Sequence, residues 1–99
     1  MNRLLDRVAI ITGAGGGIGR GIARRFASEG ASVVIADINA EMGQQTAAEI
    51  SRDFGSKAIP VTTDVSNKES VLAMVDTTIR SFGRVDILLH VVGGWTGGK

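Results

Sequence analysis

Short apolar segments alternate with longer amphipathic segments along the whole chain. Four short runs are rich in valine and isoleucine, and they span residues 8–11, 33–36, 58–61 and 87–92. Continuous apolar runs of this length are typical of strands that are covered on both faces, as in a parallel sheet. The pattern therefore predicts four buried β-strands.

The segments between these runs have the period of amphipathic helices. Their apolar residues recur every three or four positions, which places them on one face of each helix. We expect these faces to pack on the sheet: Ile18, Ile22 and Phe26; Ala47, Ile50 and Phe54; Val71, Val75, Ile79 and Phe82. The predicted order of elements is β-α-β-α-β-α-β.

Residues between the segments support the same division. Asn39 is placed to cap the second helix, and Ser66 with Glu69 forms an S-x-x-E capping box before the third. A glycine follows each helical segment, where a left-handed residue commonly ends a helix: Gly30, Gly55 and Gly83.

Alternating strands and helices indicate an α/β fold with a parallel sheet and right-handed crossovers. In a Rossmann-type, mononucleotide-binding half the strand order begins 3-2-1-4, so the third strand lies at an edge. Pro60 falls in that strand and lacks an amide hydrogen, which a sheet tolerates at its edge. We therefore predict one Rossmann-type domain over residues 1–99, with residues 93–99 as a flexible tail.

Composition narrows the class of protein. The chain is 43% hydrophobic and 21% charged, as in ordinary globular chains, and its net charge of +1 favours neither nucleic acid nor a membrane surface as a partner. It has no cysteine, which excludes disulfides, thiolate metal sites and a cysteine nucleophile. No segment has the pattern of a signal peptide or a membrane span, so we expect a cytoplasmic protein.

The first predicted strand leads into a glycine-rich segment, TGAGGGIG, at residues 12–19. The segment does not fit G-x-G-x-x-G in any register, but Gly13, Gly17 and Gly19 fit G-x-x-x-G-x-G. Such glycines let the backbone approach a pyrophosphate, and the free N–H groups at a helix start favour an anion. A glycine-rich turn without a ligand remains the alternative.

Two carboxylates lie where the next two strands end. Asp37 ends the second strand, where it is placed to accept the ribose hydroxyl protons of an adenosine and to repel a 2′-phosphate. Asp64 and Val65 end the third strand, where an adenine edge would lie. Each aspartate has a helix-capping role as its alternative, but together with the glycine turn they predict a dinucleotide site.

These motifs resemble those of the short-chain dehydrogenases/reductases, and the resemblance covers essentially the whole chain. It rests on TGAGGGIG, on VVIADIN, on TTDVS and on FGRVDILLHVVGG. The resemblance implies that the pyrophosphate is held by Gly13, Gly17, Ile18 and Gly19, and that Asp64 and Val65 flank the adenine.

The resemblance also bears on cofactor choice. An acidic residue at Asp37 implies NAD, with NADP less favoured. Relatives that prefer NADP often carry a basic residue at positions that are Gly16, Ile38 and Asn39 here. We therefore include Asp37 and Ile38 among the expected cofactor-binding residues.

The fourth motif departs from the family pattern. The family usually has Asn-Asn-Ala-Gly after the fourth strand, and this chain has His90, Val91, Val92 and Gly93. A backbone contact of Val91 with the cofactor is compatible with this change. We interpret His90, the only histidine, as a strand residue whose imidazole replaces part of the lost hydrogen bonding, in preference to a catalytic or metal-binding role.

The family's reaction uses a tyrosine and a lysine four residues apart, with a serine upstream. This chain has no tyrosine, so we expect no catalytic residue within it. The resemblance implies the N-terminal, cofactor-binding half of an NAD-dependent oxidoreductase acting on alcohols or ketones, ending before the catalytic half. A non-catalytic dinucleotide-binding or assembly module is the alternative.

Two further expectations concern the last residues. The segment GGWTGGK, residues 93–99, matches G-x-x-x-x-G-K but lacks the following Ser/Thr and helix of a P-loop, so we favour a tail. If the fourth strand forms a sheet edge, its apolar run ILLHVV is a template for pairing. We expect self-association, or binding of a complementary C-terminal half, through this strand.

Overall fold

The structure is a computed structural model, and it describes residues 3–91. Strands and helices alternate within them in the predicted order: β1 Val8–Thr12, α1 Gly17–Ser28, β2 Ser32–Asp37, α2 Ala40–Phe54, β3 Ala58–Thr62, α3 Lys68–Phe82 and β4 Ile87–His90. The last strand is shorter than the predicted run of residues 87–92, because Val91 lies beyond it. Val92 and the predicted tail, with its P-loop-like segment, lie outside the described residues.

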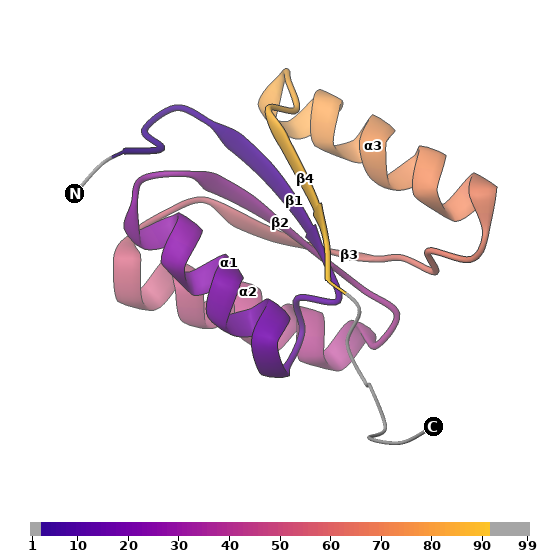
Figure 1. Cartoon of the computed structure of the whole chain (residues 1–99), viewed down its shortest axis with the longest axis horizontal. Helices are drawn as coiled ribbons and strands as arrows, with labels where there is room; N and C mark the ends of the chain where they lie inside the picture. The colour runs from indigo at the N-terminus through magenta and orange to yellow at the C-terminus, as the bar shows by residue number, and fades with distance from the viewer. Residues whose placement is uncertain (1–2, 92–99) are drawn as a thin grey trace.

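The strands form one parallel sheet with the order β3-β2-β1-β4, which confirms the predicted 3-2-1-4 topology. Pro60 lies in β3 at one edge, as expected for a residue without an amide hydrogen. Figure 1 shows α1 and α2 together on one side of the sheet and α3 on the other. None of the helices in the described range is long and apolar enough to cross a membrane.

The core consists of two apolar layers, one on each face of the two central strands. Alternate residues of β1 and β2, such as Ile11 and Ile35, pack toward α1 and α2. Their neighbours Ile10 and Val34 pack with Met74 on the α3 side. Every residue of β1 is buried, as predicted for a strand that is covered on both faces.

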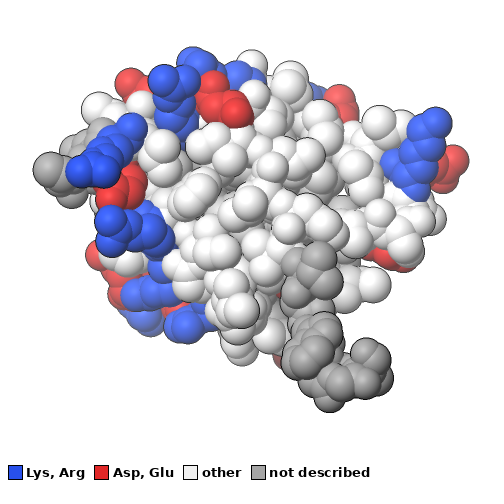
Figure 2. Space-filling view, in the orientation of Figure 1, with Lys and Arg blue, Asp and Glu red and all other residues white. Residues whose placement is uncertain are grey.

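The outer strands are less covered than predicted. β3 and β4 contain only half-buried and exposed residues, and Leu88 is 57% exposed. Each of them has a neighbouring strand on one side only within the described residues. In the view of Figure 2, charged side chains gather toward the two sides, and uncharged side chains occupy the middle, where β4 runs in Figure 1.

The predicted packing faces of the helices are confirmed for most of their residues. Those that pack with the two core layers are Ile22, Phe26, Ala47, Ile50, Val71, Val75 and Phe82. The buried residues of α1 are Gly19, Ala23 and Ala27, whereas Ile18 is 77% exposed. Small side chains let the helix backbone approach the sheet closely, and this moves bulkier neighbours to the margin. In the other two helices, the predicted core residues Phe54 and Ile79 are 39% and 45% exposed.

Most of the predicted helix caps are confirmed. Met42 N donates to the Asn39 side chain at 3.0 Å, at the start of α2. The three glycines predicted to follow the helices have left-handed φ values of 99°, 67° and 85°: Gly30, Gly55 and Gly83.

The predicted capping box before α3 is wrong. α3 begins at Lys68, so Asn67 is its N-cap and accepts a hydrogen bond from Ser70 N at 3.0 Å. The hydroxyl of Ser66 instead donates to Asp64 at 2.6 Å. Asn67 takes the capping position because its side chain reaches the backbone three residues later.

Asp86 joins the start of β4 to the start of β1. Its Oδ2 accepts a hydrogen bond from Val8 N at 2.8 Å, and its Oδ1 accepts two from the Arg84 guanidinium at 3.1 and 2.7 Å. The Arg84 hydrogen bonds, and then the one from Val8, lower the pKa of this carboxyl group below its usual value. The ionised form is therefore the one that holds the two strands together.

Replacing this carboxylate (Asp86→Asn) should weaken the fold in a pH-dependent way. A carboxyl whose folded-state pKa is lowered stabilises the fold above its usual pKa of about 4, and this contribution is lost as the pH falls through the folded-state pKa. We expect the variant to unfold at lower urea concentration than wild type at pH 7, with the difference shrinking below about pH 4. Asp76→Asn, at a 62%-exposed side chain on α3, is the control and should change little. A constant difference across the pH range would contradict this role.

Candidate functional site

A cavity of about 790 Å³ opens beside the carboxyl ends of the strands. In an open parallel sheet this is the edge at which ligands bind. The cavity is lined by every residue predicted for the cofactor site except Gly19: Gly13, Gly17, Ile18, Asp37, Ile38, Asp64, Val65 and Val91. The fold thus brings together segments that lie far apart in the sequence.

The three glycines of the motif are required at their positions for different structural reasons. A Cβ on Gly13 would lie 2.6 Å from Val91 O, and one on Gly19 would overlap the carbonyl of Gly13. Gly17 has a left-handed φ of 60°, yet among the described residues no atom beyond its own stretch of backbone lies within 4 Å of the position its Cβ would take. Protein packing therefore accounts for Gly13 and Gly19, whereas the space at Gly17 is open to a ligand.

The start of α1 is suited to an anion. Its N-cap is Gly16, which has no side chain to bond the first N–H groups, and its first turn has no acidic residue. These N–H groups lack partners within the helix, and the helix dipole adds positive potential at the same end. The lining of the cavity along Gly16, Gly17 and Ile18 places this helix start at its wall.

Asp37 connects the end of β2 to the glycine turn. Its Oδ2 accepts a hydrogen bond from Gly15 N at 2.9 Å, and its Oδ1 accepts one from Asn39 N at 2.8 Å. The second bond is the helix-start role that the sequence left as the alternative. A carboxylate has about four acceptor positions, so two remain for a ligand in the cavity.

Asp64 forms a local turn at another side of the cavity. Its Oδ1 accepts hydrogen bonds from the hydroxyl and the backbone N of Ser66, at 2.6 and 3.0 Å. These bonds, the hydroxyl first, lower the pKa of the carboxyl group below its usual value and keep it ionised. The next residue, Val65, is 48% exposed, and Ile38 is 69% exposed. The cavity thus combines exposed apolar side chains with two carboxylates.

His90 is the last residue of β4, as expected for a strand residue. Its Nδ1 lies 2.7 Å from Thr12 Oγ1, so the imidazole ties β4 to β1. Just beyond the strand, Val91 N donates to Thr12 O at 3.3 Å. No group of three or more metal-ligating side chains is present in the part of the chain that the structure describes.

Among the residues at the site that were not predicted, two belong to α2. Met42 lines the cavity, and its Cε would overlap a Cβ on Gly16. Thr46 is buried, and its hydroxyl donates to Gly15 O at 3.0 Å. Both belong to α2, whose sequence shows only an amphipathic helix, so no signal in the chain pointed to the glycine turn as their neighbour.

Comparison with known proteins gives matches over nearly the whole chain. Residues 7–99 match the family model described as short chain dehydrogenase. A short chain dehydrogenase/reductase, astE, from Aspergillus oryzae is 51% identical over 87 residues, which are 88% of this chain and 33% of that protein.

Solved structures give the same result. A hydroxysteroid dehydrogenase from Escherichia coli is similar with a TM-score of 0.88 and 43% identity, over 93% of this chain and 39% of that one. A 3-ketoacyl-(acyl-carrier-protein) reductase from Brucella melitensis, complexed with NADH, has a TM-score of 0.79 and 45% identity, over 86% of this chain and 34% of that one. The chain spans between a third and two fifths of the length of these proteins.

Proposed function

The chain belongs to the short-chain dehydrogenase/reductase family, and on this premise we propose that it is the NAD-binding half of an oxidoreductase acting on alcohols or ketones. The observation that carries the proposal is the cavity beside the glycine turn, which has the Asp37 carboxylate and the start of α1 in its wall. The family relatives named above include a hydroxysteroid dehydrogenase and a ketoacyl reductase, both of which act on such groups.

The residues present fit a nicotinamide dinucleotide. The open space at Gly17 and the uncapped start of α1 suit a pyrophosphate, which needs close backbone approach and N–H donors. The exposed apolar side chains of Ile38 and Val65 suit the faces of an adenine. We propose that Gly13, Gly17, Ile18, Gly19, Asp37, Ile38, Asp64, Val65 and Val91 make up the cofactor site.

Charge supports NAD over NADP as the cofactor. The described residues that line the cavity include two aspartates and no lysine or arginine. The free acceptor positions of Asp37 suit the two hydroxyls of an adenosine ribose, whereas a 2′-phosphate would meet a carboxylate with no cation to neutralise it. Two of the three arginines of α1, Arg20 and Arg24, pair with carboxylates of α2, and the third, Arg25, pairs with Glu29.

The residues of this chain bind and orient, and the bound nicotinamide would supply the hydride chemistry. The His90–Thr12 bond holds the ends of β1 and β4 together at the wall of the cavity. The family's proton-transferring group is a tyrosine, and the 99 residues include none. We propose that acid–base catalysis depends on residues outside this segment.

Asp37→Ala tests the proposed ribose contact. Asp37 also bonds Gly15 N, so its loss should weaken the binding of both dinucleotides through the turn, but only NAD(H) loses an acceptor for a 2′-hydroxyl. A charge-assisted hydrogen bond is worth about 1.5–3 kcal/mol, so we expect NAD affinity to fall by at least about tenfold and the preference over NADP to narrow. Calorimetric titration of both dinucleotides measures the ratio. Equal affinity of the unmutated chain for NAD and NADP would contradict the proposal.

Gly17→Ala tests the pyrophosphate contact, and Gly55→Ala is the matched control. Both glycines have left-handed φ values, 60° and 67°, and in the described part of the chain neither Cβ position has an atom of a residue distant in sequence within 4 Å. Each substitution should therefore cost a similar 1–2 kcal/mol of stability, roughly. Only Gly17→Ala places a methyl group in the ligand space, so only it should abolish NAD binding in calorimetry. Normal NAD binding by the Gly17→Ala variant would mean that the glycine segment is a structural turn that does not contact the ligand.

We also propose that the outer edge of β4 pairs with a further strand. The edge has no neighbour within the described residues, and the strand's exposed Leu88 adds apolar surface. A complementary C-terminal half of the same kind of protein would supply this strand. The 99-residue chain by itself would obtain it from a second copy.

Leu88→Lys tests this edge, and Leu72→Lys on α3 is the control because both leucines are 57% exposed. A lysine on an edge strand disfavours pairing with another chain. We expect Leu88→Lys to shift the 99-residue chain toward monomer in sedimentation velocity, while Leu72→Lys leaves its association unchanged. An equal shift for both variants would mean that general apolar surface, and not the strand edge, drives association.

A further inference from the structure

Thr46 of α2 contacts the glycine turn from outside the cavity. The residue is 1% exposed, and its Oγ1 donates a hydrogen bond to Gly15 O at 3.0 Å, across 31 positions of sequence. On the other side of Gly15, the backbone N donates to Asp37 Oδ2 at 2.9 Å. The backbone of Gly15 is therefore held at both of its polar groups by side chains from two different elements.

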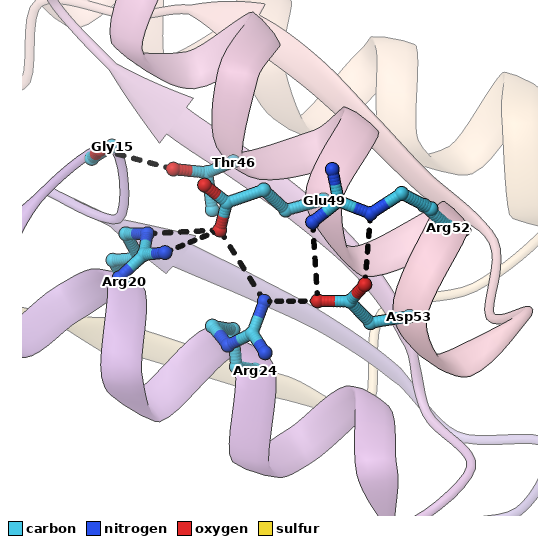
Figure 3. Close-up of polar contacts among 7 residues, drawn as sticks. All are labelled: Gly15, Arg20, Arg24, Thr46, Glu49, Arg52 and Asp53. Atoms are coloured by element: carbon cyan, nitrogen blue, oxygen red, sulfur yellow. Dashed lines mark hydrogen bonds and ion pairs between the residues drawn. The ribbon is translucent and has the colours of Figure 1, made fainter.

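The same face of α2 also fixes α1, as Figure 3 shows. One turn after Thr46, Glu49 Oε1 accepts hydrogen bonds from both Arg20 and Arg24 of α1. One turn further, Asp53 accepts a hydrogen bond from Arg24 at 3.0 Å. These three side chains of α2 hold the glycine turn at one end and the helix that follows it at the other.

The turn needs such a restraint because of its sequence. Gly15, Gly16 and Gly17 follow one another, and glycine loses more conformational freedom on ordering than any other residue. If the turn is ordered only when a ligand binds, that cost reduces affinity. A turn that is ordered beforehand avoids this cost.

The Thr46 bond acts on the peptide group between Gly15 and Gly16, just before the start of α1. The carbonyl of Gly15 and the N–H of Gly16 belong to one planar peptide unit, so fixing the carbonyl also fixes the direction of that N–H. Gly16 is the N-cap of α1 and lines the cavity. The contact of Thr46 with Gly15 thus sets the orientation of a donor at the cavity wall.

We propose that Thr46 is a positioning residue for dinucleotide binding, whose buried hydroxyl holds the three-glycine turn in its binding conformation before the ligand arrives. The inference rests on the proposed function, because the ligand is the proposed dinucleotide. The effect expected of Thr46 on cofactor affinity differs from that of Asp37, which is proposed to distinguish NAD from NADP. Thr46 acts on the turn proposed to bind the phosphates that both dinucleotides share. Loss of the Thr46 hydroxyl should therefore lower the affinities for NAD and NADP by the same factor.

Thr46→Val keeps the shape of the side chain and removes the hydroxyl. We expect NAD affinity to fall by about tenfold, the effect of leaving a buried carbonyl without its hydrogen bond, with the ratio of NAD to NADP affinity unchanged. Thr46→Ser retains the hydroxyl and should restore most of the affinity. Thr78→Val is the matched control, because Thr78 is fully buried and its hydroxyl donates to Met74 O at 2.8 Å, on the α3 side. It should change stability without changing affinity.

Amide hydrogen exchange of Gly16 and Gly17 in the ligand-free 99-residue chain gives an independent measurement. We expect faster exchange in Thr46→Val than in wild type, and no change in Thr78→Val. Unchanged exchange and unchanged affinity in Thr46→Val would overturn the proposal, as would failure of Thr46→Ser to restore affinity in a folded chain. Absence of NAD binding by wild type would overturn the proposed function instead, and the exchange comparison would still decide whether Thr46 orders the turn.

Discussion

The bond between the Asp37 carboxylate and the backbone of Gly15 is the contact on which the site depends. It joins the end of β2 to the turn after β1, and the same carboxylate also bonds Asn39 N at the start of α2. One side chain therefore holds the segments that follow the two central strands. A ligand at the cavity meets a carboxylate that is already oriented by the fold, with acceptor positions to spare.

The site also requires small residues at the start of α1, which let this helix pack closely against the glycine turn and the sheet. Gly19 lies against the carbonyl of Gly13, and the buried face of α1 consists of Gly19, Ala23 and Ala27. Because this face is small, α1 lies close to the sheet and its first turn reaches the edge at which the cavity opens. Ile18 lies outside this buried face, and its exposed side chain lines the cavity.

The ends of β1 and β4 are joined next to the cavity. The His90 imidazole bonds the Thr12 hydroxyl across the two strands. Val91 contributes backbone, both to Thr12 and in the close approach to Gly13. These contacts hold the strand ends together beside the cavity that we propose binds the dinucleotide.

The sequence by itself predicted the order of elements from periodicity and local signals, the sheet topology from the Rossmann-type pattern, and the cavity-lining residues from motifs and a family resemblance. The periodicity and the local signals are properties of neighbouring residues: strand-length apolar runs, the Asn39 cap and the glycines after the helices. The tertiary structure alone decided that the small residues of α1 are buried while Ile18 is exposed. It also decided that Asn67 and not Ser66 caps α3, and that Thr46 and Met42 meet the glycine turn. The physical reason is that burial and long-range hydrogen bonds depend on how closely each helix approaches the sheet, and that distance is set by the packing of residues that are far apart in the sequence.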